Sequence, residues 1–178
     1  MEVIDDFISP SDHEQLEKWA LGTSVRWKYN RFKVYKGDDQ PQFTHRCFEP
    51  QRFPIAIEPS MKRLDPILYK LTLDPFYLDL LVRIKLNLTL ATPEIITTPY
   101  HTDTCLFNKT AIYYINSNNG YTIFEDGTKV GSKANRIVIF DAQTEHAGTT
   151  HTDEDIQSRC VVNINYFPKA FFKDEDYS

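Results

Sequence analysis

The sequence predicts a mainly β fold with flanking helices, in which an antiparallel sandwich or barrel has helices packed on one side. Residues 78–90 alternate apolar and largely polar side chains with a period of two, the strongest strand pattern in the chain. Beyond residue 90, short apolar runs are separated by turns that contain Gly and Asn. They add four predicted strands, at residues 111–115, 121–124, 135–140 and 159–167.

Two helices are predicted before this β region. Ser9 is a candidate N-cap with Pro10 at the first helical position, and Gly22 is a candidate left-handed residue at the helix end. Apolar residues at helical spacing predict a second helix over residues 61–71. Pro66 either confines this helix to one side of itself or kinks it.

Residues 26–36 interleave basic and aromatic side chains. The simpler interpretation is a β-ribbon with one wet, basic face. Interleaved cations and rings could instead hold single-stranded nucleic acid. The formal net charge of -5 argues against nonspecific nucleic-acid binding as the main role of the chain.

Length and composition place the chain among single-domain proteins. The 178 residues suit one domain with one sizeable core. No apolar run approaches the roughly 20 residues that span a bilayer, and the first residues lack a signal-peptide pattern. We therefore expect no membrane association and a cytoplasmic location, where Cys47, Cys105 and Cys160 stay reduced.

His101-Thr102-Asp103 is the candidate metal motif. Residues i and i+2 of a strand point to one side, so His101 and Asp103 could reach one metal ion. Together with a distant histidine they would form the 2-His-1-carboxylate set that holds non-haem Fe(II) and leaves coordination positions open. The tripeptide recurs at residues 151–153, but no histidine follows, and residues 149–157 predict a solvated loop. His146 and His151 both remain candidate distal ligands.

The region from residue 78 to residue 167 resembles the Fe(II)- and 2-oxoglutarate-dependent dioxygenases, and looks most like their prolyl-hydroxylase branch. The matching pieces are HTD at 101–103, TAIYYIN at 110–116, the segment 120–127, NRIVIFD at 135–141, HAG at 146–148 and RCVVNINYF at 159–167. The resemblance implies a double-stranded β-helix (jelly roll) core at residues 78–168, supported by residues 1–75. Both parts would belong to a single domain spanning residues 1–178.

The same resemblance implies roles for individual residues. The implied Fe(II) ligands are His101, Asp103 and His146. His146 is preferred to His151 because the pattern from Phe140-Asp141 to His146-Ala147-Gly148 fits the family. Arg159 would pair with the distal carboxylate of 2-oxoglutarate, and Tyr114 would hydrogen-bond the same group. Further candidate contacts to the cosubstrate are Asn163 and Asn87. Many relatives carry Arg-x-Ser where this chain has Val161, so one hydroxyl contact is missing.

The implied reaction is hydroxylation of a substrate C–H bond, with O2 consumed and succinate and CO2 released. Ascorbate is a further candidate cofactor. The leading substrate is a peptide or protein side chain such as proline, and the alternatives are oxidative demethylation of nucleic acid and hydroxylation of a small metabolite. A noncatalytic jelly roll that binds a metal or a ligand is a different class, disfavoured because it has no need for all of His101, Asp103, His146 and Arg159. The sequence does not indicate the oligomeric state.

Overall fold

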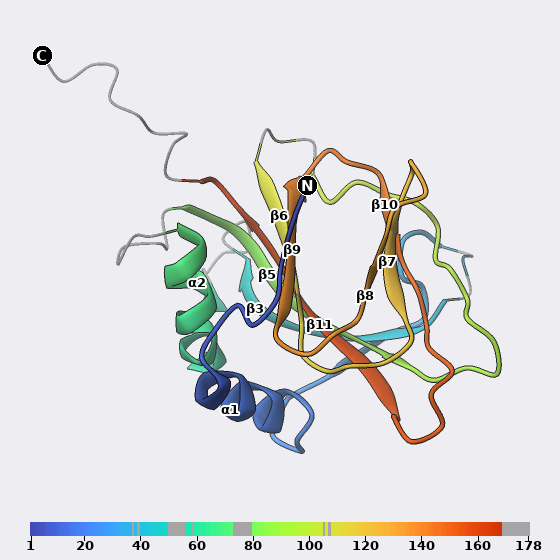
Figure 1. Cartoon of the computed structure of the whole chain (residues 1–178), viewed down its shortest axis with the longest axis horizontal. Helices are drawn as coiled ribbons and strands as arrows, with labels where there is room; N and C mark the ends of the chain where they lie inside the picture. The colour runs from blue at the N-terminus through green and yellow to red at the C-terminus, as the bar shows by residue number, and fades with distance from the viewer. Residues whose placement is uncertain are drawn as a thin grey trace, which may run out of the picture.

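Two antiparallel sheets form the body of the computed structural model (Figure 1), which describes residues 1–36, 38, 40–49, 56–57, 59–72, 80–104, 106 and 108–168. The larger sheet contains, in spatial order, β1 (Glu2–Ile4), β9 (Arg136–Asp141), β6 (Lys109–Tyr114), β11 (Ser158–Tyr166), β5 (Leu81–Leu90), β3 (Gln42–Glu49) and β2 (Lys28–Asn30), with β4 (Ala56–Ile57) paired to β3. The smaller sheet contains β10 (His146–Gly148), β7 (Tyr121–Phe124) and β8 (Lys129–Gly131). The prediction of a mainly β fold with flanking helices is confirmed.

The two faces of the larger sheet differ because side chains alternate along its strands. Ile84 and Leu86 of β5 and Ile164 of β11 point to the outer face and are fully buried there. Lys85 and Asn87 alternate with these residues along β5 and point to the inner face, toward the smaller sheet. The sheet is therefore apolar outside and largely polar along the inner face of β5.

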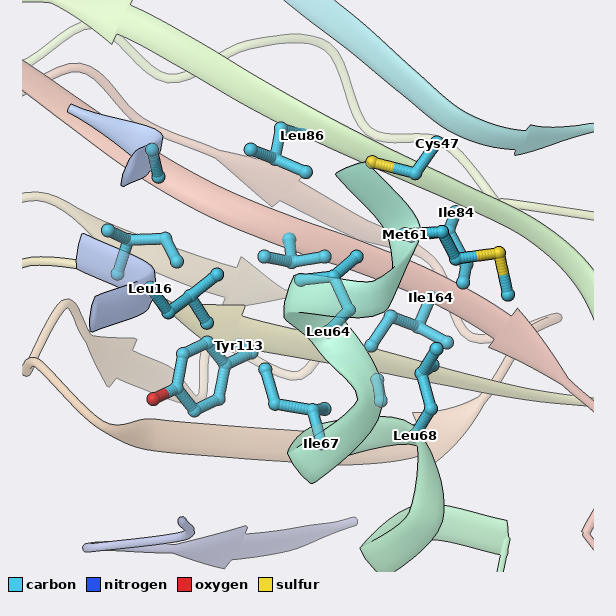
Figure 2. Close-up of a cluster of buried hydrophobic side chains, with 14 of the residues drawn as sticks. Leu16, Cys47, Met61, Leu64, Ile67, Leu68, Ile84, Leu86, Tyr113 and Ile164 are labelled. Atoms are coloured by element: carbon cyan, nitrogen blue, oxygen red, sulfur yellow. The ribbon is translucent and has the colours of Figure 1, made fainter. Parts of the chain in front are cut away.

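Three helical segments cover the outer face of the larger sheet (Figure 1). They are α1 (Pro10–Ala20), the 3-10 helix η1 (Pro59–Leu64) and α2 (Asp65–Thr72). Figure 2 shows Leu64, Ile67 and Leu68 facing strand side chains such as Ile84 and Tyr113. Among the described residues, no helix is both long and apolar enough to cross a membrane.

A second, smaller apolar cluster lies between the two sheets. Its members are Ile112, Tyr114, Phe124, Val130, Val138, Phe140 and Val161. They come from β6, β9 and β11 of the larger sheet and from β7 and β8 of the smaller one. The cluster fixes the spacing of the sheets, and the space beside it is left to polar side chains.

The predicted strands after residue 100 are confirmed to within two residues at each end. Predicted strands 111–115, 121–124, 135–140 and 159–167 correspond to β6, β7, β9 and β11. The strand predicted from residue 78 begins as β5 at Leu81, and residues 78 and 79 lie outside the described residues. Pro66 is the second residue of α2, in the first turn, where the missing N–H breaks no helical hydrogen bond.

The helix start was predicted correctly, but the role predicted for Gly22 was wrong. Ser9 caps α1 by accepting a hydrogen bond from the backbone N–H of Asp12, and Pro10 begins the helix. The cap residue at the other end is Leu21, in a right-handed conformation, and Gly22 has no positive φ. Glycine is needed there for space, because a Cβ at Gly22 would lie 2.7 Å from the backbone oxygen of Lys18.

The β-ribbon predicted over residues 26–36 is also wrong in most of its length. Only Lys28–Asn30 forms a strand, β2. After it, the backbone N–H groups of Lys33, Val34 and Tyr35 donate to the Asp38 carboxylate instead of to a neighbouring strand. A local acceptor of this kind competes with sheet pairing and produces a compact loop.

The solvated loop predicted at residues 149–157 is partly wrong. Thr149, Thr150 and His151 are buried. The backbone N–H groups of Thr149 and Thr150 donate to the backbone oxygens of Tyr121 and Ile96, at 3.0 Å each. These bonds replace water, so a polar segment can be buried at little cost.

Leu64→Ala should lower the free energy of unfolding by about 2–5 kcal/mol, because it opens a cavity between the helices and the larger sheet. Urea unfolding followed by circular dichroism measures this loss. The control is Tyr69→Ala on the exposed side of α2, which should change the free energy by no more than about 0.5 kcal/mol. Equal losses in the two variants would contradict the packing described for α2.

Candidate functional site

His101 and His146 are brought together by backbone pairing. Residues 97–101 run antiparallel to residues 146–149, through bridges between Thr97 and Thr149 and between His101 and His146. The two histidines exchange both backbone hydrogen bonds, each 3.0 Å long. Directly opposed residues of an antiparallel pair share one face. Their imidazole ring centres accordingly lie 4.8 Å apart.

Asp103 completes a cluster with these two histidines. The candidate ligand atoms of His101, Asp103 and His146 lie within 4.8 Å of one another, so that the three could hold a metal ion. Nδ1 of His101 lies 3.2 Å from the backbone oxygen of Pro99, and Nδ1 of His146 lies 3.0 Å from that of Thr144. A carbonyl only accepts, so these contacts place a proton on each Nδ1 and make Nε2 the candidate ligand nitrogen of each ring.

Hydrogen bonds orient the Asp103 carboxylate. Oδ1 accepts from Arg83 at 3.1 Å, Oδ2 accepts from Thr110 at 3.0 Å, and the amide nitrogen of Asn163 lies within 3.2 Å of both oxygens. Burial raises the pKa of Asp103, but His146, Arg83 and these hydrogen bonds outweigh it, so the pKa lies below its ordinary value. Asp103 is therefore ionised at neutral pH.

The partners of Asp103 are themselves connected. Arg83 donates to Asn165 at 3.1 Å, and Asn165 donates to Thr110 at 2.8 Å, which closes a ring through the carboxylate. Sequence reasoning missed Arg83, Thr110 and Asn165. The signal that could have found them is register: Asn165 lies opposite Arg83 on β5 and opposite Thr110 on β6.

The protonation state of His101 also suits a ligand. Burial, followed by the proximity of His146, lowers the pKa of His101. The imidazole is therefore neutral at neutral pH, the state in which histidine binds metals.

Arg159 is a buried cation that faces no carboxylate among the described residues. Its side chain donates to the hydroxyl of Ser132 at 2.7 Å and to that of Thr122 at 3.4 Å. The guanidinium carbon lies 5.6 Å from the ring centre of Tyr114. Burial lowers the pKa of Arg159, but an arginine remains charged at neutral pH. A planar, anchored guanidinium with donors to spare is suited to a carboxylate ligand.

One pocket contains Arg159 and both histidines. It is lined by Lys33, Asn87, Thr89, His101, Ile112, Thr122, His146, Gly148, Arg159, Val161 and Asn163. Three of its polar atoms are buried without a hydrogen-bond partner among the described residues, namely Oδ1 of Asn87, Oγ1 of Thr89 and Oδ1 of Asn163. Buried polar atoms are normally paired because leaving them unpaired costs free energy. The pocket is therefore equipped for a polar ligand.

The other predicted site residues lie in or near the same pocket, except His151. Asn87 and Asn163 line the pocket, and Asn163 also holds Asp103. Tyr114 lies beside the Arg159 guanidinium, with its hydroxyl donating to Thr122 at 2.8 Å. Their contacts to a cosubstrate stay predictions. His151 lies outside the cluster of three. It is buried, and neither of its ring nitrogens has a hydrogen-bond partner among the described residues.

Sequence reasoning also missed Lys33, which lines the pocket although it belongs to the segment predicted as a wet ribbon. Burial, together with the charges of Arg159 and Lys85, lowers the pKa of Lys33 to about 7. No sequence pattern marks it, because the loop that carries it is shaped by the side-chain carboxylate of Asp38 and not by strand pairing.

No protein-family model matches this chain, and no curated protein matches its sequence. Solved structures do match its fold. An oxidoreductase of the 2OG-Fe(II) oxygenase family from Burkholderia pseudomallei gives a TM-score of 0.62 at 12% identity, over 88% of this chain and 78% of that one.

Two prolyl hydroxylases also match. The enzyme from Trichoplax adhaerens, in complex with a hypoxia inducible factor oxygen degradation domain peptide fragment, gives a TM-score of 0.61 at 13% identity, over 97% of this chain and 87% of that one. A prolyl-4-hydroxylase from Pseudomonas putida gives 0.51 at 12% identity, over 94% and 91%. At these identities the likeness establishes the fold, and the predicted double-stranded β-helix is confirmed.

Arg83→Met should weaken Co(II) binding at the cluster roughly 10- to 100-fold, because a carboxylate that loses its orienting partner is a poorer ligand. Isothermal titration calorimetry of the metal-free protein with Co(II) measures the change. Arg46→Met removes another arginine of the larger sheet, one that pairs with Glu49 at the surface, and should leave the affinity unchanged. Wild-type affinity in Arg83→Met would contradict the orienting role of Arg83.

Proposed function

We propose that this protein is an Fe(II)- and 2-oxoglutarate-dependent dioxygenase of the prolyl-hydroxylase-like branch, which hydroxylates a substrate C–H bond. The observation that carries the proposal is that the two histidines of a His-Asp-His cluster line the same pocket as a buried arginine that faces no carboxylate among the described residues. A metal-binding module needs only the first of these, and an anion-binding module needs only the second.

The donor set fits Fe(II). His101, Asp103 and His146 supply two imidazole nitrogens and one carboxylate, and a backbone carbonyl engages Nδ1 of each histidine, so Nε2 is the candidate ligand atom. Both imidazoles are held by backbone carbonyls and the carboxylate by side chains, so little ordering remains to be done when the metal enters. Three protein ligands leave further coordination positions for a cosubstrate and O2.

The rest of the pocket fits 2-oxoglutarate. Arg159 can pair with its distal carboxylate, and the unpaired polar atoms of Asn87, Thr89 and Asn163 can meet its other polar groups or bound water. Gly148 leaves open the space beside Arg159, since a Cβ there would lie 3.8 Å from a guanidinium nitrogen. Tyr114 would support this end of the site by fixing Thr122 and packing on Arg159.

When bound together, Fe(II), 2-oxoglutarate and O2 would supply the oxidising power for hydroxylation, with succinate and CO2 as coproducts. The protein's own residues fix geometry. His101, Asp103 and His146 would hold the metal, and Arg159 would hold the distal carboxylate of the cosubstrate. Ile112 and Val161 give the pocket an apolar side that limits water.

We propose a peptide or protein side chain, such as proline, as the substrate. Support comes from the fold shared with two prolyl hydroxylases, one of them solved with a peptide. Oxidative demethylation of nucleic acid has less support, because Lys33 of the basic and aromatic segment 26–36 lines the pocket instead of an outer face. A small metabolite remains the alternative substrate class, and ascorbate remains a candidate accessory reductant.

His101→Ala, Asp103→Ala and His146→Ala should each abolish 2-oxoglutarate turnover, measured as succinate release, and each should lose Co(II) binding at the cluster. Turnover and Co(II) binding are both lost because the two remaining ligands hold the metal poorly. His151→Gln should keep both properties, since His151 lies outside the cluster. Loss of metal binding in His151→Gln together with its survival in His146→Ala would reverse the choice of distal ligand.

Arg159→Met should weaken 2-oxoglutarate binding to the Mn(II)-loaded protein roughly 10- to 150-fold, the effect of losing a hydrogen-bonded charge partner, and should leave Mn(II) binding intact. Calorimetry under nitrogen measures both affinities. Arg136→Met serves as the control, because Arg136 pairs with Asp5 at the protein surface. Unchanged cosubstrate affinity in Arg159→Met would remove the assigned role of this arginine.

A further inference from the structure

Lys33 and Arg159 reach the same point of the pocket from different parts of the chain. A Cβ added to Gly148 would lie 3.2 Å from Nζ of Lys33 and 3.8 Å from a guanidinium nitrogen of Arg159. Because Gly148 has no side chain, the space next to both cations is left open. Arg159 approaches from β11, whereas Lys33 approaches from the loop that follows β2.

Hydrogen bonds to the Asp38 carboxylate hold the described part of the loop that carries Lys33. The Asp38 carboxylate accepts backbone hydrogen bonds from Lys33, Val34, Tyr35 and Gln40, at distances between 2.6 and 3.2 Å. In addition, the side-chain amide of Gln42 donates to the backbone oxygen of Lys33 at 3.4 Å. Lys33 is thereby held at the start of a closed turn, and its side chain is directed into the pocket.

Two neighbouring cations in a buried site are unfavourable without an anion. Burial, then Arg159 and then Lys85 lower the pKa of Lys33 to about 7, and Asp38 only partly opposes this. The Asp38 oxygens are already shared among the backbone N–H groups of the loop. An entering carboxylate would compensate both Lys33 and Arg159 and would raise the pKa of Lys33 again.

We propose that Lys33 is a second cationic ligand for the distal carboxylate of 2-oxoglutarate, acting together with Arg159 in the space beside Gly148. This inference rests on the proposed function. It explains how the site manages with Val161 at the position where many relatives place a serine hydroxyl. The carboxylate would be shared by the Arg159 guanidinium on the larger sheet and the Lys33 ammonium on the loop. Cosubstrate binding would therefore also link the loop to the larger sheet.

The test compares two ligands on the Mn(II)-loaded protein under nitrogen, by isothermal titration calorimetry. One ligand is 2-oxoglutarate, and the other is 2-oxopentanoate, which has the same chain length and lacks the distal carboxylate. Lys33→Met should weaken 2-oxoglutarate binding roughly 10- to 100-fold and leave 2-oxopentanoate binding nearly unchanged. Lys36→Met, which removes an exposed lysine from the same loop, should change neither affinity.

A second readout separates a charge contact from a packing role. The charged groups that face Lys33 are Arg159, Lys85 and Asp38, and the partly buried, neutral His101 is a further titratable neighbour. Above a pH of about 7, free Lys33 is increasingly neutral, so binding of the carboxylate should take up a proton and the affinity should fall as the pH rises. In Lys33→Arg the cation is kept at all pH values, so most of the affinity should return without this pH dependence.

The binding results distinguish failure of the proposed function from failure of the role inferred for Lys33. If the wild-type protein binds neither Mn(II) nor 2-oxoglutarate, the proposed function and this inference both fail. If it binds both and Lys33→Met binds 2-oxoglutarate equally well, only the inference fails. Equal weakening for 2-oxoglutarate and 2-oxopentanoate also overturns it, because Lys33 would then act on the loop or on the keto-acid end. Loss confined to 2-oxoglutarate, with recovery in Lys33→Arg, supports it.

Discussion

The structure depends on how charge is compensated in the space between its two sheets. Charges removed from water are costly unless opposite charges or hydrogen bonds replace the lost solvation. Asp103 is fully compensated, because Arg83, Thr110 and Asn163 all donate to it. Arg159 is compensated only in part, by two hydroxyl groups and an aromatic ring. The His-Asp-His cluster beside the pocket is therefore complete as a ligand set, whereas Arg159 within the pocket has no anionic partner among the described residues.

The packing of the larger sheet makes this arrangement stable. Its outer face carries the main apolar core against α1, η1 and α2, so the fold does not depend on the inner face for most of its burial. The smaller cluster around Phe124 and Val138 packs between the two sheets. The remaining inner positions are free to carry polar residues such as Asn87 and Asn163. Stability and site chemistry thus occupy alternate positions of the same strands.

Much of this could be predicted from the sequence, because strand periodicity and a three-residue motif are local signals. Four strands around the site and the pairing of His101 with Asp103 followed from such signals, whereas the choice of His146 came from the resemblance to the dioxygenases. Arg83 could not be identified as a partner of Asp103, since that depends on register between strands distant in sequence. Lys33 could not be placed either, because its loop is shaped by a side-chain carboxylate where the local pattern favours a strand.

The most direct test of the account is a crystal structure of the protein grown under nitrogen with Mn(II) and 2-oxoglutarate. The account predicts one metal ion bound by His101, Asp103 and His146, with the distal carboxylate of 2-oxoglutarate against Arg159. A metal ion bound elsewhere, or a carboxylate that leaves Arg159 without an anionic partner, would contradict it.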